Sequence, residues 1–326
     1  MFFAPLGRTG LKVSRLGLGL AALGRPGYIN LGHAADLAHN YDSAAMEAHC
    51  HQVLDAAWAE GIAYFDAARS YGRAESFLAS WLSSRRIDAR NVVIGSKWGY
   101  SYTANWHVQA DKHEIKNHSL SVLRTQFSES QALLGSYLRL YQIHSATLES
   151  GVLDNRDVID ELKRMREAGL KIGLTLSGPN QSDTLTRAIE IGIFDCVQAT
   201  WNLLEPSAAP ALQLAHELGI GIIVKEALAN GRLTSRNTDP SFMRKREILE
   251  ACAGELGCTL DALAIAAALH QPWVDLVLSG AATVDQIRSN VGALKVTLND
   301  AVQGQLAGLA ENPAEYWQFR RTLAWN

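Results

Sequence analysis

Cysteine is scarce in this chain. Its 326 residues include four cysteines, and none lies in a Cys-x-x-Cys pair or a ligand-like cluster: Cys50, Cys196, Cys252 and Cys258. Such scattered thiols exclude the disulfide framework of a small secreted domain and give no zinc-binding pattern. We expect reduced thiols, with Cys196 a small core residue because it lies in an apolar run.

Excess charge and long apolar runs are also absent. A net charge of −3 and a pI near 6.4 give no electrostatic reason to expect nucleic acid or an anionic membrane surface as partner. No run approaches the roughly 18 uninterrupted apolar residues of a membrane-spanning helix. The first residues, Met1–Gly7, lack the basic start and long apolar core of a signal peptide. We therefore expect a soluble, cytoplasmic protein.

Apolar residues make up 48% of the chain, enough for a large core, and many gather in short runs. Eight of these runs predict β-strands: Leu16–Leu20, Ile62–Asp66, Val92–Lys97, Leu138–Ile143, Lys171–Leu176, Cys196–Thr200, Gly221–Lys225 and Val274–Ser279. Between them lie amphipathic helical segments, such as Ala44–Ala59 and Asp157–Ala168. Eight strand–helix units predict an α/β fold, a closed (β/α)8 TIM barrel, as one domain over residues 1–326.

A doubly wound open sheet is the alternative fold. It normally carries a glycine-rich G-x-G-x-x-G fingerprint after its first strand, and Gly17–Ala22 does not have that spacing. At the start of the chain, Thr9-Gly10 lies between two short alternating segments and predicts an N-terminal β-hairpin. Two long loops, Arg25–Ser43 and Gly99–Lys116, follow the first and third predicted strands at the C-terminal face, where long loops are usually functional.

Four polar residues stand at or just after the ends of successive strands. Asp66 ends one strand, Tyr71 follows it by five residues, and Lys97 and His144 end the next two. The carboxyl ends of parallel strands share one edge, so these side chains are expected to meet there. Taken singly, an Asp66–Lys97 pair is more often a structural ion pair and Tyr71 a half-exposed loop aromatic, while His144 is equally consistent with a core imidazole.

Together the four groups suit reduction of a carbonyl. Delivery of a hydride builds negative charge on the carbonyl oxygen, so a proton donor must be positioned there. Tyr71 is the expected donor, with the Lys97 ammonium lowering the pKa of its phenol and Asp66 holding that ammonium in place. His144 is expected to orient the carbonyl by a hydrogen bond or to relay a proton.

These motifs resemble the aldo-keto reductase family from Leu6 to about Asn290. The opening Leu6–Ser14 looks like the family's Leu-Gly-x-(Thr/Ser)-Gly-Leu-x-Val-Ser start, and its Asp, Tyr, Lys, His tetrad falls on Asp66, Tyr71, Lys97 and His144. The resemblance implies an enzyme: an NAD(P)H-dependent oxidoreductase that reduces an aldehyde or ketone to an alcohol, or runs the reverse reaction, without a metal.

The resemblance also implies a set of cofactor-binding residues. Trp201 falls where the family stacks an aromatic on the nicotinamide, Ser177 and Gln198 where it binds the carboxamide, and Arg232 near the pyrophosphate. The remaining candidates are Asn202, Lys225, Ser279, Gly280, Thr283, Gln286 and Asn290.

The chain departs from the family pattern in three places. Gly178 follows Ser177 where the family often has asparagine. Lys225-Glu226 replaces an apolar or tyrosyl segment and adds an expected ion pair or substrate contact. Ala282 replaces a basic residue that holds the 2′-phosphate of NADPH in relatives. We therefore keep NADP(H) as the expected cofactor, with weak discrimination and NAD(H) usable as well.

Two other functions remain open at this stage. One is a cofactor-binding regulatory barrel with little turnover, against which the intact tetrad argues. The other is a metal-dependent barrel enzyme, but His49 and His51 do not share a face of their predicted helix and make poor ligands. The expected partner is a small carbonyl or alcohol substrate; neither its identity nor the oligomeric state follows from the sequence.

Overall fold

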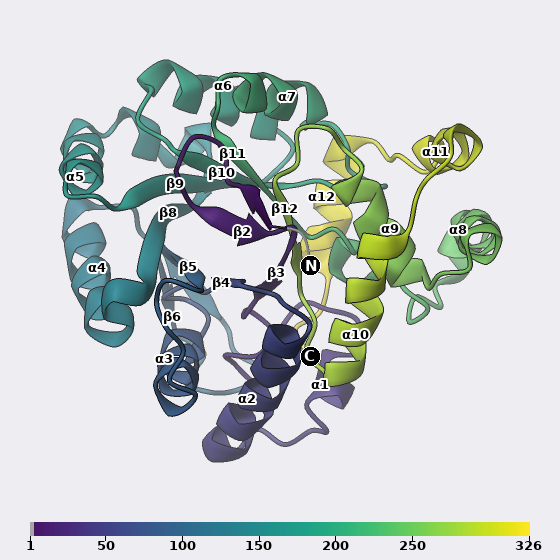
Figure 1. The fold of residues 1–326 in the computed structure, drawn as a ribbon, viewed down its shortest axis with the longest axis horizontal. Helices are drawn as coiled ribbons and strands as arrows, with labels where there is room; N and C mark the ends of the chain where they lie inside the picture. Colours follow the sequence, from purple (N-terminus) through teal and green to yellow (C-terminus); the bar gives the residue numbers. More distant parts are fainter. Residues whose placement is uncertain (1–2) are drawn as a thin grey trace.

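The computed structural model describes residues 3–326 and contains a closed barrel of eight parallel strands. In chain order around the barrel they are β3 (Leu16–Gly19), β4 (Tyr64–Asp66), β5 (Val93–Trp98), β8 (Leu138–Ala146), β9 (Lys171–Leu176), β10 (Cys196–Thr200), β11 (Gly221–Lys225) and β12 (Leu276–Ser279). Because all neighbouring pairs are parallel, the eight carboxyl ends lie on one face. The predicted TIM barrel is confirmed (Figure 1).

Helices surround the barrel (Figure 1). Those that follow the strands are α2 (Ser43–Ala59), α3 (Ala74–Ser84), α4 (Leu120–Leu134), α5 (Arg156–Glu167), α6 (Gln181–Ile191), α7 (Ala209–Glu217), α9 (Leu260–Leu269) and α10 (Val284–Gly292). The additional helices are α1 (His33–Asp36), α8 (Met243–Leu256), α11 (Asp300–Ala307) and α12 (Pro313–Thr322). Side-chain caps fix several starts: Asp42 accepts from the Ala45 amide at the start of α2, and Thr283 from the Gln286 amide at the start of α10.

The N-terminal hairpin closes the amino end of the barrel. Its strands, β1 (Phe3–Pro5) and β2 (Lys12–Ser14), pair antiparallel as predicted. The turn between them binds the barrel rim, where the Gly7 amide donates to Asp275 Oδ2 at 3.0 Å. Leu6 and Leu11 are buried in one cluster with side chains from the strands, so the hairpin completes the core at this end.

Three strands begin later than predicted: β5 starts at Val93, one residue after Val92, and the other two start two residues late. β4 starts at Tyr64 and not Ile62, and β12 starts at Leu276 and not Val274. The Ile62 amide donates to Ala57 O and the Val274 amide to Gln271 O, so both residues belong to turns after helices. Both side chains are buried, as in a strand, but the backbone amides bond within these turns and not to a neighbouring strand.

Both long loops contain short elements. Gly99–Lys116 forms an antiparallel hairpin of β6 (Tyr100–Tyr102) and β7 (Glu114–Lys116), and Arg25–Ser43 contains α1. Residues 3–326 also contain six 3₁₀ turns: Gly135–Tyr137, Leu148–Ser150, Val152–Asp154, Ala229–Gly231, Pro240–Phe242 and Ala293–Lys295.

A membrane-spanning helix was not expected from the sequence. Between Phe3 and Asn326, no single helix is long and apolar enough to cross a membrane. A bent pair, Pro240–Leu256 with Leu260–Leu269, meets the criterion by length and composition only.

Candidate active site

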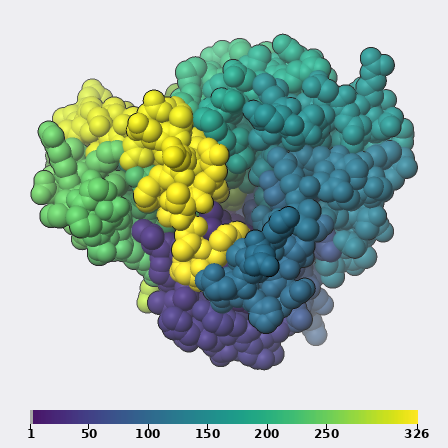
Figure 2. Space-filling model, turned by 180° about the vertical axis from the view of Figure 1, so that it is seen from behind, coloured from purple at the N-terminus to yellow at the C-terminus, as the bar shows by residue number. Residues whose placement is uncertain are grey.

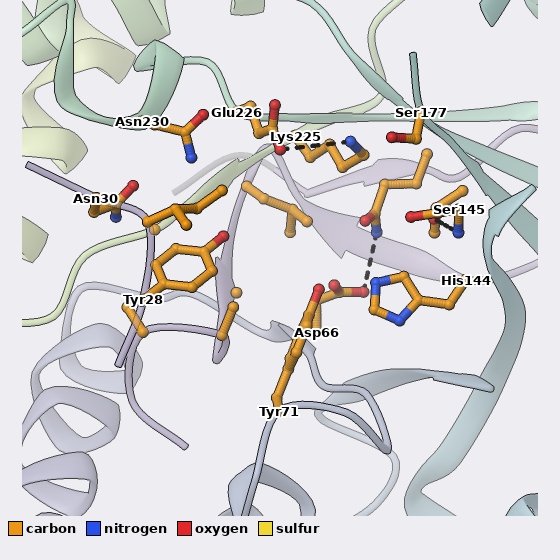
Figure 3. Close-up of a pocket in the computed structure, with 18 of the residues that line it drawn as sticks. Tyr28, Asn30, Asp66, Tyr71, His144, Ser145, Ser177, Lys225, Glu226 and Asn230 are labelled. Carbon is orange, nitrogen blue, oxygen red and sulfur yellow. Dashed lines mark hydrogen bonds and ion pairs between the residues drawn. The ribbon is translucent and has the colours of Figure 1, made fainter. Parts of the chain in front are cut away.

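A cavity of about 290 Å³ opens at the carboxyl face of the barrel. Strand ends supply much of its wall: Asp66 from β4, His144 from β8, Gln198 from β10, Lys225 from β11 and Ser279 from β12. Figure 3 shows Asp66 and the ring of His144 close to the hydroxyl end of Tyr71. We call this space the first cavity.

Asp66 is the centre of a buried hydrogen-bond network. Its carboxylate forms an ion pair with Lys97 Nζ and accepts from the side-chain amide of Gln198 at 3.1 Å and that of Gln142 at 3.3 Å. Lys97 is 1% exposed, lies behind Asp66 outside the cavity lining, and also donates to Ala67 O at 2.9 Å. A buried pair with this many partners holds a fixed geometry, so Asp66 and Lys97 act as one unit.

Gly95 makes room for this network. A Cβ at this position would lie 2.5 Å from the hydroxyl oxygen of Tyr64 and 3.4 Å from Asp66 Oδ1. The Tyr64 hydroxyl donates to Asp66 Oδ1 at 3.3 Å. Only glycine leaves space for that donor beside the carboxylate.

Tyr71 lies in the loop after β4, and tight backbone packing sets its position. Gly72, at φ +59°, packs so closely on Gly24 that an added Cβ would lie 2.4 Å from Gly24 O. The ring of Tyr71 meets His144 edge to face, with centroids 5.5 Å apart, and Lys97 Nζ lies 4.8 Å from the Tyr71 ring centroid. The four residues of the predicted tetrad therefore converge.

The expected pKa shift of Tyr71 is wrong in direction. Burial and the Asp66 carboxylate raise the pKa of its phenol well above the ordinary value, and Arg25 opposes them only in part. The Lys97 ammonium is paired with Asp66, so its charge is offset next to the phenol. Tyr71 is consequently a fully protonated phenol at neutral pH, which preserves its ability to donate.

His144 is directed by a β-bulge. The register of β8 against β9 shifts between Ile143 and Ala146, and Ser145 adopts φ +52° there. Such bulges redirect side chains beside active sites. Burial, followed by Lys97 and other nearby cations, lowers the pKa of His144 well below its usual value. The imidazole is therefore neutral and carries one N–H donor.

The Lys225-Glu226 segment forms a charged wall of the first cavity (Figure 3). Lys225 Nζ donates to Thr200 Oγ1 at 2.7 Å and lies 3.8 Å from Glu226 Oε1, which confirms the expected ion pair. Arg320 from α12 binds the Glu226 carboxylate through two nitrogens. Burial lowers the pKa of Lys225 to about 8. Burial alone would raise the pKa of Glu226, but Arg320 and Lys225 outweigh it and hold that pKa at about 2.

The C-terminal segment forms another wall, which the sequence did not predict. Figure 2 shows the last residues crossing the face opposite to that of Figure 1. Trp325 lines the first cavity, and Arg25 lies over its ring at 4.8 Å and over that of Tyr71 at 5.3 Å. Arg25 also pairs with Glu114 of β7. Both long loops thus reach the cavity, as expected of functional loops.

A second cavity, of about 750 Å³, adjoins the first. Asn30, Leu228 and Gly280 line both, so the two spaces are direct neighbours. Of the expected cofactor residues, the first cavity is lined by Ser177, Gln198, Lys225, Ser279 and Gly280, and the second by Gly280, Thr283, Gln286 and Asn290.

Three expected cofactor residues lie elsewhere. Trp201 is 5% exposed and packs against Trp273, with ring centroids 6.0 Å apart, and lines neither cavity. Asn202 is fully buried and fixes a turn by accepting from the Leu204 and Glu205 amides. These placements contradict nicotinamide stacking by Trp201 and cofactor contact by Asn202.

Arg232 also lies away from both cavities. Its guanidinium binds Glu311 through two nitrogens at 2.9 and 2.7 Å, and it lines neither cavity. The cation that lines the second cavity is Arg236, four residues further along the chain. A basic residue of this loop thus lines a cavity, but it is Arg236 and not the expected Arg232.

Comparisons with known proteins agree with this geometry. The model of the Aldo/keto reductase family matches residues 15–311. The chain belongs to the aldo/keto reductase family. This aldo/keto reductase is 24% identical to an NADH-specific methylglyoxal reductase of Escherichia coli (strain K12), over 94% of this chain and 98% of that one. It is 27% identical to a pyridoxal 4-dehydrogenase of Microbacterium luteolum, over 88% of this chain and 91% of that one.

A solved structure supports the fold. The chain is similar to the holo form of an aldo-keto reductase from Bacillus halodurans, with a TM-score of 0.74 and 21% identity over 96% of this chain and 97% of that one. This aldo/keto reductase is an enzyme and an oxidoreductase that uses NAD(P)H, as the sequence predicts.

The residues present fit such a cofactor. The amide of Asn230 lines the first cavity and its buried Oδ1 has no hydrogen-bond partner, while Ser177 and Gln198 add a hydroxyl and an amide nearby. These neutral donors and acceptors suit a carboxamide. The second cavity adjoins the first and has the volume for the other half of a dinucleotide.

Proposed function

We propose that this aldo/keto reductase reduces a small aldehyde or ketone to its alcohol, or catalyses the reverse reaction, with Tyr71 as the proton donor. The observation that carries the proposal is the meeting of Tyr71, His144 and the Asp66–Lys97 pair at one cavity. A bound NAD(P)H supplies the hydride for the carbonyl carbon.

Each of the four side chains has a distinct task in this proposal. Tyr71, kept protonated by its raised pKa, donates to the carbonyl oxygen as negative charge develops. Neutral His144 donates a hydrogen bond to the same oxygen and orients the substrate. Lys97 stabilises the phenolate that remains, and Asp66 holds Lys97 in place.

Eight of the residues named from the sequence are proposed to hold the cofactor. Ser177, Gln198 and Lys225 line the first cavity near the tetrad and serve the nicotinamide half of the cofactor. Ser279 also lines the first cavity, and Gly280 lines both. Thr283, Gln286 and Asn290, on or before α10, line the second cavity and serve the adenosine half.

The small first cavity favours a compact substrate. Arg25, Glu114, Lys225, Glu226 and Arg320 bring charge to its wall, but every one of these groups is paired. A neutral, polar carbonyl compound fits such a wall better than an ion. Relatives named for methylglyoxal and pyridoxal make those two aldehydes the first compounds to test. Because all four cysteines are free thiols, we also infer a reducing compartment, the cytoplasm.

The experiment is a screen of purified enzyme with aldehydes and ketones, including methylglyoxal and pyridoxal, in the presence of NADH or NADPH. We expect carbonyl-dependent loss of reduced-cofactor absorbance and formation of the alcohol. Tight cofactor binding without turnover of any carbonyl or alcohol would instead support a regulatory barrel.

A further inference from the structure

The second cavity has one cationic side chain among the residues that line it. Arg236 is the only lysine or arginine in the described lining, whereas four acidic residues share it: Asp36, Glu250, Asp261 and Asp285. This imbalance matters because NADPH and NADH differ only by a 2′-phosphate on the adenosine ribose. The charges of the side chains that line the second cavity therefore bear on the choice between NADH and NADPH.

The guanidinium of Arg236 is already occupied. Its two terminal nitrogens bind the two carboxylate oxygens of Asp36 at 2.7 and 2.5 Å, and one also donates to Leu31 O at 3.2 Å. Planar bidentate pairing is the same geometry by which arginine binds a phosphate. Asp36 therefore occupies the face of Arg236 that a 2′-phosphate would need.

Asp36 is held firmly in this position. Its carboxylate is 7% exposed, against 38% for the Arg236 side chain. It accepts a further hydrogen bond from Gln286 Nε2 at 3.0 Å, and Gln286 Oε1 in turn accepts from the Ala282 amide at 2.7 Å. Two nitrogens of Arg236 and one of Gln286 thus hold the Asp36 carboxylate at the cavity, so its displacement by a phosphate costs free energy.

No other lysine or arginine of the described residues lines the second cavity to replace Arg236. Arg288 is 65% exposed and its nearest acid is Asp285, 3.7 Å away. The Thr283 hydroxyl accepts from the Gln286 amide. A doubly charged phosphate would thus meet carboxylates and a neutralised arginine, whereas the 2′-hydroxyl of NADH brings no charge and can donate to a carboxylate.

We propose that Asp36 makes this enzyme select NAD(H) over NADP(H) by occupying Arg236, and that Arg236 is a phosphate-binding residue held in reserve. The inference rests on the proposed function in so far as the second cavity holds the adenosine half of the cofactor. It departs from the sequence expectation, which kept NADP(H) as the cofactor with weak discrimination and NAD(H) usable as well.

The test is calorimetric measurement of the Kd of NADH and of NADPH, without substrate and at one ionic strength. Wild-type enzyme is expected to bind NADH at least about tenfold more tightly than NADPH. Asp36→Asn is expected to tighten NADPH binding by about 10- to 100-fold, the worth of one or two hydrogen bonds to a charged group. NADH affinity should change by less than about threefold.

Two further variants complete the design. Adding Arg236→Gln to Asp36→Asn is expected to cancel the gain for NADPH, because the gain depends on a free guanidinium. Glu190→Gln, which removes an exposed acid that lines neither cavity, serves as the control and should leave both Kd values within about threefold. Thermal unfolding of each variant verifies that it is folded, and Asp36→Ser replaces Asp36→Asn if the latter does not fold.

The outcomes separate the two proposals. Equal or tighter binding of NADPH by the wild type, or an unchanged NADH-to-NADPH ratio in Asp36→Asn, overturns the role of Asp36 while the proposed reductase stands. Failure of the wild type to bind either dinucleotide overturns the proposed function itself.

Discussion

The two cavities are built in different ways. The first combines loop residues with residues at strand ends, such as Asp66 and His144, whose positions the barrel fixes. The second is formed by loops and helix ends, and its principal ion pair joins Asp36 to Arg236 across 200 residues. The comparison teaches that chemistry placed on strands can be predicted from local pattern, whereas a contact between two loops cannot.

The ion pairs also differ in burial. Lys97 and Asp66 have side chains 1% and 3% exposed, whereas Arg236 is 38% exposed. A buried pair costs much more to break than an exposed one, because the remaining charge stays in a medium of low polarity. We therefore expect breaking the Asp66–Lys97 pair to cost more stability than breaking the Asp36–Arg236 pair, in which Asp36 is 7% exposed but the arginine stays partly in water.

The largest effect is expected from Lys97→Met. It leaves the Asp66 carboxylate without its cation, which should cost about 3–5 kcal/mol of stability in denaturant unfolding. It should also lower kcat by a factor on the order of 10² or more, since a protonated Tyr71 then has no cation to stabilise its phenolate. A folded Lys97→Met enzyme in which only KM rises would make Lys97 a binding residue.

Glu226→Gln tests whether removing a charge from the Lys225-Glu226 wall lowers stability strongly, as expected for the buried Asp66–Lys97 pair. The pKa of Glu226 is about 2, below its ordinary value near 4.5, so its ionised form stabilises the fold above pH 4.5. That contribution, on the order of 3 kcal/mol, is lost as the pH falls from 4.5 toward 2.

The Gln variant should therefore be less stable at pH 7 and show a weaker loss of stability between pH 4.5 and 2. Glu190→Gln, which removes one side of an exposed pair with Arg187, is the control and should change stability by less than about 1 kcal/mol. Equal effects of the two substitutions would contradict the comparison between buried and exposed pairs.

Gly95→Ala tests the tight packing behind Asp66. The new methyl group would overlap the Tyr64 hydroxyl, and we expect a loss of about 1–3 kcal/mol together with lower kcat. Tyr64→Phe in the same chain removes the overlapping oxygen and should restore part of the stability. Gly304→Ala, on α11 with nothing within 4 Å of the added Cβ, should instead be neutral or stabilising by up to about 1 kcal/mol. A neutral Gly95→Ala would mean that this part of the site is not rigid.

The smallest effect is expected from Trp201→Phe. Because Trp201 packs on Trp273 and lines neither cavity, the Kd of NADH should change by less than about twofold. A tenfold weakening of NADH binding with an unchanged unfolding temperature would show that Trp201 does contact the nicotinamide.

Much of the fold was predictable because eight short apolar runs alternate with amphipathic segments along the sequence. Three strands have the predicted bounds: Lys171–Leu176, Cys196–Thr200 and Gly221–Lys225. The tetrad residues converge because each lies near or shortly after the carboxyl end of a barrel strand. The single-domain boundary at residues 1–326 stays a prediction.

The remaining features depend on tertiary contacts. Arg232 and Arg236 are equally basic in sequence, and only the positions of Glu311 and Asp36 decide which one lines a cavity. The wall formed by Trp325 requires the chain end to cross the barrel face, for which the sequence carries no periodic signal. The pKa of Tyr71 rises because its phenol is buried and lies near the Asp66 carboxylate, an effect of distances that residue order does not reveal.

The central claim, that Tyr71 donates the proton in carbonyl reduction, is tested most directly by single-turnover kinetics of Tyr71→Phe loaded with NADH and saturated with the best aldehyde from the screen. The account predicts a rate of cofactor oxidation lower by a factor of about 10²–10⁴, with the Kd of NADH unchanged. A rate within about threefold of the wild type would contradict it.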